Sequence, residues 1–175
     1  MAPPIVVRPA RIDDVPALAR VIVTSWRETY RGIMRDEVLD DPDLVAARER
    51  FWTAVFEDER YAANRASVAE RDGEVIGVAM SGVPLDTDAT WPRQLYVLYV
   101  LAAEHGSGAG HTLLEAVAPA GEDVALWVAD PNPRAQAFYL AHGFAFDGAV
   151  KIEDGVTELR MVRVARPGEG VRQAG

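Results

Sequence analysis

Residues Leu95–Ala118 read L-Y-V-L-Y-V-L-A-A-E-H-G-S-G-A-G-H-T-L-L-E-A-V-A, and this stretch decides the fold. Its first part, Leu95–Leu101, is the run of aliphatic and aromatic residues expected of a buried strand. Three alternate glycines follow, and apolar residues then recur at helical spacing from Leu113 to Val117 until Pro119 stops the helix. The order is strand, glycine loop, helix. Because the first helical turn has free N–H groups and a positive dipole end, the loop predicts a phosphate site.

Three kinds of phosphate-binding loop use glycines in this way, and their spacing distinguishes them. A P-loop requires G-x-x-x-x-G-K-S/T, but His111-Thr112 follows Gly110 and the lysine is missing. A dinucleotide-binding loop requires G-x-G-x-x-G, and here the third glycine comes one residue too early. The acetyl-CoA loop has the pattern Q/R-x-x-G-x-G/A. The segment from His105 to Gly110, H-G-S-G-A-G, agrees with that pattern at every position but the first.

A second motif follows the next short apolar run, Val124–Val128, which predicts another strand. Residues Asp130–Tyr139 read D-P-N-P-R-A-Q-A-F-Y, and H-G-F follows at 142–144. Asn132 is a favoured N-cap, and the proline after it suits the first helical position. Gly143 suits the left-handed position just after a helix. This segment therefore predicts a strand followed by a capped helix.

Together the two segments resemble the GNAT superfamily of acetyl-CoA-dependent N-acetyltransferases. The first resembles the acetyl-CoA loop of that family, and the second resembles its strand, N-x-x-A-x-x-F-Y helix and G-F ending. The resemblance implies an α/β (α+β) fold with a mixed, mostly antiparallel central sheet and helices on both faces. It also implies a central parallel pair, Leu95–Leu101 and Val124–Val128, which splays apart to admit the pantetheine arm of CoA.

The rest of the chain supplies further strands and helices. We expect a single domain over residues 5–166, followed by a loose, glycine-rich tail at 167–175. Patterning predicts a strand at Ile5–Arg8, then a helix opened by Asp13 or Asp14 with Val15, Leu18 and Ile22 inward, and a second helix at Asp43–Phe56. It also predicts two hairpins. The first pairs Ser67–Glu70 with Glu74–Val83 and turns at 71–73, and the last pairs Ala145–Lys151 with Thr157–Val164 and turns at 153–155.

Composition narrows the class of protein. With 175 residues, 49% of them hydrophobic and 26% charged, the chain is an ordinary globular domain. It has no cysteine, which excludes disulfides and thiol catalysis, and no apolar run of membrane-spanning length or signal-peptide pattern. We therefore expect a cytoplasmic protein without a membrane partner. The net charge of −9 argues against nucleic acid and is compatible with a cationic amine as acceptor. A homodimer is left open.

The resemblance implies where acetyl-CoA, the expected co-substrate, would bind. Backbone N–H groups of the glycine loop would face the diphosphate, and those at the strand end would face the thioester. Asn132 would contact CoA, or would serve only as the helix N-cap. No His/Asp/Glu cluster has metal-ligand spacing, so no metal is expected. The predicted cofactor-binding residues are Val100, Leu101, Ala102, His105, Gly106, Ser107, Gly108, Ala109, Gly110, His111 and Asn132.

Acetyl transfer to an amine needs three chemical aids. An amine with a pKa of about 10.4 must lose a proton before it attacks. The tetrahedral intermediate needs N–H donors, which the free backbone at Val100–Ala102 could supply. The leaving thiolate needs a proton or a hydrogen bond. The resemblance assigns that last role to Tyr139, whose alternative interpretation is core packing.

The general base and the acceptor cleft are less clearly marked. Many relatives carry glutamate near the start of the central strand, where this chain has Gln94, which is a poor base. Glu28 is the candidate substitute, with a surface carboxylate or a water relay as alternatives. The W-x-x-x-Y-x-G segment places Trp26 and Tyr30 either at the acceptor cleft or in the core.

Two classes of function follow from these residues. The first is transfer of an acetyl group from acetyl-CoA to a primary amine of a small molecule or of a peptide or protein. The second is a non-catalytic module that binds acyl-CoA, which the presence of Tyr139 argues against. Antibiotic, polyamine, amino-acid and protein amines all stay open as acceptors, because the acceptor cleft is built from the least patterned segments.

Overall fold

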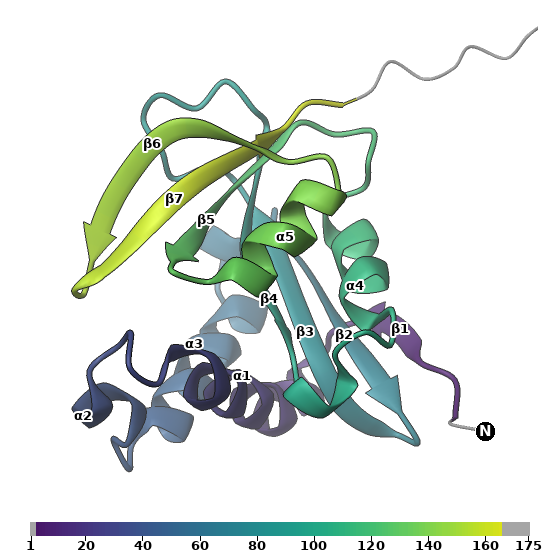
Figure 1. Cartoon of the computed structure of the whole chain (residues 1–175). Helices are drawn as coiled ribbons and strands as arrows, with labels where there is room; N and C mark the ends of the chain where they lie inside the picture. Colours follow the sequence, from purple (N-terminus) through teal and green to yellow (C-terminus); the bar gives the residue numbers. More distant parts are fainter. Residues whose placement is uncertain (1–2, 166–175) are drawn as a thin grey trace, which may run out of the picture.

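The computed structural model describes residues 3–165 and shows a seven-stranded sheet with helices on both faces (Figure 1). The strands are β1 Val6–Pro9, β2 Arg65–Arg71, β3 Glu74–Gly82, β4 Arg93–Val100, β5 Val124–Asp130, β6 Ala145–Glu153 and β7 Val156–Arg163. The α-helices are α1 Val15–Tyr30, α2 Asp36–Leu39, α3 Leu44–Glu57, α4 Ala109–Val117 and α5 Pro133–Ala141. The strand order is β1-β2-β3-β4-β5-β7-β6, and every neighbouring pair is antiparallel except β4 and β5.

Both predicted hairpins are confirmed, and their turns have the expected chemistry. Asp72 and Gly73 join β2 to β3 with φ values of 53° and 80°. Asp154 and Gly155 join β6 to β7 with φ values of 51° and 80°. Two successive residues with positive φ match the right-handed twist of the flanking strands, and Asp-Gly is the residue pair that tolerates this conformation best.

The parallel pair splays apart, as predicted. Strands β4 and β5 pair only along Arg93–Leu95 and Val124–Leu126, and no register is formed beyond that point. The remainder of β4 keeps its partner β3 on one side, where the Leu101 N–H donates to the Ile76 oxygen at 3.0 Å. Because successive N–H groups of a strand point to opposite sides, the Val100 N–H points into the opening between β4 and β5.

Two apolar clusters hold the helices against the sheet. On one face α1 and α3 pack together over β3 and β4, with Leu18, Ile22 and Trp52 almost fully buried. On the other face α4 packs over β1 to β4, and α5 lies beside β5 (Figure 1). The α4 residues Leu113 and Val117, which the helical spacing singled out, have no exposed surface. Burying a side chain of this size contributes about 1.5–3 kcal/mol.

The predicted fold class is therefore confirmed, and the predicted element ends fall within a few residues of those observed. Helix α2 is an addition, since no pattern at Asp36–Leu39 predicted it. No helix among residues 3–165 is long and apolar enough to cross a membrane. The predicted tail, 167–175, lies outside the described residues.

Candidate functional site

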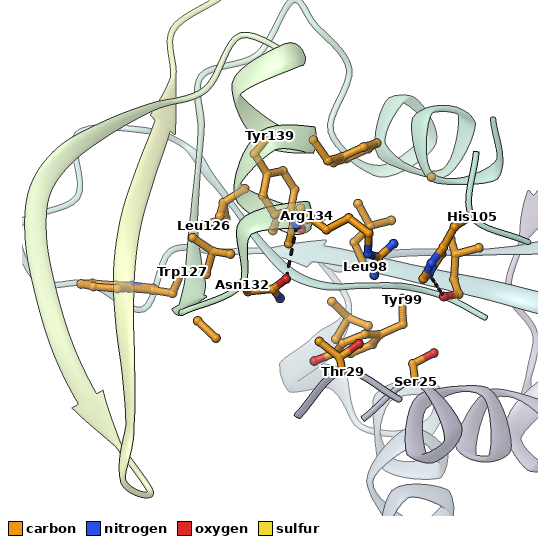
Figure 2. Close-up of a pocket in the computed structure, with 18 of the residues that line it drawn as sticks. Ser25, Thr29, Leu98, Tyr99, His105, Leu126, Trp127, Asn132, Arg134 and Tyr139 are labelled. Carbon is orange, nitrogen blue, oxygen red and sulfur yellow. Dashed lines mark hydrogen bonds between the residues drawn. The ribbon is translucent and has the colours of Figure 1, made fainter. Parts of the chain in front are cut away.

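A cavity of about 510 Å³ occupies the opening between β4 and β5. Its walls come from α1, β4, the glycine loop with the start of α4, β5, α5 and β7, so that segments between Ser25 and Glu158 meet there (Figure 2). We call it the first cavity. Of the predicted site residues, its lining includes Tyr30, Val100, His105, Gly106, Gly108, Gly110, His111, Asn132 and Tyr139.

The glycine loop forms the anion-binding end of this cavity. Within residues 3–165 no protein acceptor pairs with the N–H groups of Gly106, Gly108, Gly110 or His111, and all four residues line the cavity. Gly106 and Gly108 have φ values of 80° and 91°, which other residues adopt only with strain. A Cβ at either position would enter open space. Free N–H groups at the start of a nine-residue helix, next to space that no side chain fills, make a cradle for phosphate.

The third glycine has a different role. Gly110 has no positive φ, but a Cβ there would come within 3.3 Å of the Phe138 ring on α5. Gly110 therefore allows α4 and α5 to approach each other at the cavity wall. The two other loop residues predicted to bind the cofactor do not line the cavity, because Ala109 is fully buried and Ser107 turns its hydroxyl toward the Ala109 N–H at 3.4 Å.

Both predicted cofactor-binding histidines have protein partners. The Nε2 of His105 donates to the Val100 oxygen at 3.0 Å, so its side chain folds back on β4 (Figure 2). The Nδ1 of His142 donates to the Phe138 oxygen at 2.7 Å, which leaves its Nε2 as an acceptor. The Nδ1 of His111 then donates to that Nε2 across 3.1 Å. The Nε2 of His111 is left for the cavity.

The strand end contributes fewer free N–H groups than predicted. Leu101 donates to β3, and the Ala102 N–H donates to the Glu28 carboxylate at 3.0 Å. Of the three predicted residues only Val100 lines the first cavity. Glu28 itself is exposed and lines neither this cavity nor the one described next. The structure therefore places Glu28 as an acceptor that fixes the turn after β4, and does not bring it to Tyr139.

A second cavity, of about 290 Å³, adjoins the first. Its lining includes the predicted cleft residues Trp26 and Tyr30, together with Gln94, whose Oε1 accepts the Leu85 N–H at 2.9 Å. We call the wall that both cavities share the neck. The neck consists of Tyr30, Leu95, Tyr96, Tyr99, Trp127, Ala129 and Glu158. Glu158 supplies the one carboxylate of the neck, so within residues 3–165 it is the acidic side chain that both cavities reach.

The tyrosines around the neck stay protonated. Burial raises the pKa of Tyr139, and the neighbouring Tyr99 raises it further. Burial also raises the pKa of Tyr30, with Tyr99 again the next cause, and burial raises the pKa of Tyr99 itself. All three phenols are therefore hydrogen-bond donors at neutral pH and not bases. The Tyr139 ring packs edge-on against Phe138 and Phe144, at centroid distances of 5.3 and 5.6 Å.

Many lining residues were not among the predicted site residues, and four of them have side chains that bear on the chemistry of the site. Arg134 lies two residues after Asn132 and extends from α5 toward β4 (Figure 2), so the second motif could have revealed it. Asn132 both lines the cavity and caps α5, its Oδ1 accepting the Ala135 N–H at 3.3 Å. The other three of these four are Tyr99, Trp127 and Glu158, and no local motif marks them.

Trp127 is held in place from several sides. Its Nε1 donates to both carboxylate oxygens of Asp86, at 3.2 and 3.1 Å. The buried Arg160 guanidinium lies 5.5 Å from the Trp127 ring and donates to Asp86, Asp88 and Asp147. This network fixes the loop before β4 against β5 and β7. The indole is therefore a rigid part of the neck.

Comparisons with known proteins agree with this geometry. The chain is 28% identical over 150 residues to a protein of Mycobacterium tuberculosis described as probable N-acetyltransferase Rv2775, covering 81% of this chain and 80% of that one. A structure described as histone acetyltransferase HPA2 and related acetyltransferase, from Corynebacterium glutamicum, superposes with a TM-score of 0.70 at 26% identity, covering 96% of this chain and 99% of that one.

A further structure has the same fold. The PaiA N-acetyltransferase of Thermoplasma acidophilum, solved in complex with coenzyme A, superposes with a TM-score of 0.71 at 20% identity, over 90% of this chain and 98% of that one. The sequence model of the acetyltransferase (GNAT) family matches residues 23–144, which include both predicted motifs. The chain therefore belongs to the acetyltransferase (GNAT) family of acetyl-transferring enzymes.

Proposed function

We propose that the protein transfers the acetyl group of acetyl-CoA to a primary amine, with each reactant in its own cavity. Acetyl-CoA lies in the first cavity, its diphosphate on the free N–H groups of the glycine loop and its pantetheine arm along the opened edge of β4. The amine enters by the second cavity. The observation that carries this proposal is the neck, because two separate cavities meet at a wall that both reactants touch. The coenzyme A complex of the Thermoplasma relative supports the position of the first reactant.

The reaction then needs only groups that line the cavities. The neutral amine attacks the thioester carbonyl, and the carbon–sulfur bond breaks as the amide forms. The Val100 N–H, which points into the opening, is placed to stabilise negative charge on the carbonyl oxygen. Tyr139 is a protonated donor in the first cavity and gives a hydrogen bond to the departing sulfur.

We propose Glu158 as the group that receives the amine. Its carboxylate attracts an ammonium in the second cavity and accepts the proton that the amine must lose. Glu28, the candidate from the sequence, binds the Ala102 N–H and lies outside both cavities. Gln94 reaches the second cavity, but its amide is occupied by the Leu85 N–H and cannot act as a base at neutral pH. The neck therefore favours Glu158.

A panel of amines tests the proposal. Release of free thiol from acetyl-CoA is followed with alkyl amines, diamines, amino acids, peptides and aminoglycosides as acceptors. We expect primary amines with a net positive charge to be used. Glu158→Gln should lower kcat/KM by about a hundredfold. Glu74→Gln is the matched control, since Glu74 is an exposed carboxylate that lines neither cavity. Binding of acetyl-CoA without thiol release for any amine would indicate a non-catalytic acyl-CoA-binding module instead.

A further inference from the structure

Lys151 is the only lysine in the sequence, and it lines the second cavity. Its Nζ lies 3.1 Å from the Oε2 of Glu158 and 2.7 Å from the Oε2 of Glu153. The same nitrogen lies 4.9 Å from the centre of the Trp127 ring. Glu158 and Trp127 both belong to the neck. A primary amine of the chain itself therefore contacts two groups that also border the first cavity.

The surroundings of this nitrogen have the chemistry that a foreign amine would need. Two carboxylates compensate its charge, and the face of an indole attracts a cation. Every other basic side chain of Lys and Arg type in this chain is arginine, which acetyl-CoA does not acylate readily because its guanidinium keeps its proton. Lys151 therefore carries the one side-chain primary amine of the sequence, and it lies where the acceptor is proposed to lie.

We propose that Lys151 is an acetyl acceptor within the chain, modified by acetyl-CoA bound in the first cavity of the same molecule when no other amine occupies the second. This inference rests on the proposed function, because it uses the same donor and the same neck. It adds a modification site, and it adds a competition between Lys151 and the external amine for the Glu158 carboxylate.

The step balances without any further reactant. The Lys151 ammonium first gives one proton to Glu158 or to water. The neutral nitrogen attacks the thioester carbonyl carbon, the carbon–nitrogen bond forms and the carbon–sulfur bond breaks. The nitrogen then loses its second proton, and the departing sulfur gains one to leave as the thiol. The products are the acetamide of Lys151, free CoA thiol and one proton.

The charges around Lys151 make this reaction slow. Burial lowers the pKa of the Lys151 ammonium, but the hydrogen bonds to Glu153 and Glu158 outweigh burial and raise it above its ordinary value. Among the described residues, the other titratable groups of this cavity are Asp154, at the turn, and the protonated phenols of Tyr30, Tyr96 and Tyr99. The neutral fraction of the amine therefore stays small at neutral pH. It grows about tenfold with each pH unit below the pKa, and the acetylation rate should follow.

Mass spectrometry of the full chain, incubated with acetyl-CoA and no amine, tests the inference. We expect one acetyl group per chain, located on Lys151 by peptide mapping, with a first-order rate that does not change when the protein is diluted. Lys151→Arg keeps a cation beside both carboxylates and should remain unmodified. An acceptor amine found in the panel should slow the modification. A rate proportional to protein concentration, or one equal to that of a lysine peptide in the same solution, would contradict acetylation within the chain.

Two further measurements separate this inference from the proposed function. Glu158→Gln should slow acetylation of Lys151 by about tenfold or more. The matched control is Glu74→Gln, an exposed carboxylate outside both cavities, which should leave the rate within about threefold. Titration calorimetry of the same samples measures acetyl-CoA binding. A chain that binds acetyl-CoA and acetylates external amines, but leaves Lys151 unmodified at pH 9, overturns the inference alone. A chain that does not bind acetyl-CoA overturns the proposed function.

Discussion

Replacing Tyr139 by phenylalanine isolates the hydroxyl group that is proposed to assist the departing sulfur. The ring of Tyr139 is 8% exposed and packs edge-on against Phe138 and Phe144. Phenylalanine keeps these contacts, and within residues 3–165 the hydroxyl has no hydrogen-bond partner that its loss would leave unpaired. The free energy of unfolding should therefore change by less than about 1 kcal/mol.

The expected fall in kcat follows from the pKa values of the tyrosine hydroxyl and of the departing thiol. An ordinary tyrosine has a pKa of about 10 and a thiol about 8.5, so full proton transfer to the thiolate is uphill by about 2 kcal/mol. Burial and Tyr99 raise the pKa of Tyr139 and widen this gap. Tyr139 therefore acts through a hydrogen bond, and removing one such donor lowers kcat between about tenfold and a few hundredfold, or about 1.4–3 kcal/mol.

The assay compares kcat, the KM for acetyl-CoA and the pH profile of both proteins. We expect a fall in kcat of the same size at every pH between 6 and 9 and little change in KM, because the hydroxyl stays protonated throughout. The loss should shrink with an acetyl thioester whose thiol is more acidic. Tyr61→Phe, outside both cavities, is the matched control. A folded Tyr139→Phe protein with the original kcat would show that the residue only packs the core.

Three further predictions concern residues outside the neck. Glu28→Gln should leave the shape of the pH–rate profile unchanged, because its amide oxygen can still accept the Ala102 N–H; a loss confined to neutral pH would instead identify Glu28 as the base. Arg160→Met leaves the carboxylates without their cation and should lower the free energy of unfolding in urea by about 2 kcal/mol. The loss stays this small because the carboxylates recover part of their hydration, and an unchanged midpoint would refute the proposed network. The Arg8 guanidinium lowers the pKa of Asp14, so this pair stabilises the fold above the ordinary carboxyl pKa of about 4 and ceases to do so as pH falls through the lower folded value. Asp14→Asn should accordingly be less stable at pH 7 and lose less stability on acidification, and parallel curves for the two proteins would contradict this.

Those parts of the fold that depend on local chemistry could be predicted from the sequence. Asn132 caps α5 as expected, because its side chain needs only the N–H three residues on. Asp72-Gly73 forms the expected turn because both residues tolerate positive φ. The glycine loop likewise brings its own free N–H groups together. In each case the partners lie within a few residues, so spacing alone determines the geometry.

The neck could not be predicted, because its chemistry depends on contacts between distant segments. Glu158 and Lys151 belong to the last hairpin, and they reach the cavities because β7 inserts between β5 and β6. No periodicity specifies that insertion. Glu28 is the candidate base from the sequence, and its carboxylate accepts the N–H of Ala102, a residue 74 positions away in sequence. A prediction that treats each segment separately cannot detect such a partner.

A crystal structure of the protein with acetyl-CoA tests the central claim most directly. We predict the diphosphate within hydrogen-bond distance of the N–H groups of Gly106, Gly108 and Gly110, and the pantetheine arm between β4 and β5. The acetyl carbon should lie at the neck, with the Tyr139 hydroxyl near the sulfur and Glu158 on the opposite side of the carbonyl. Acetyl-CoA bound elsewhere, or a thioester that does not reach the neck, would contradict the proposed path of the acetyl group.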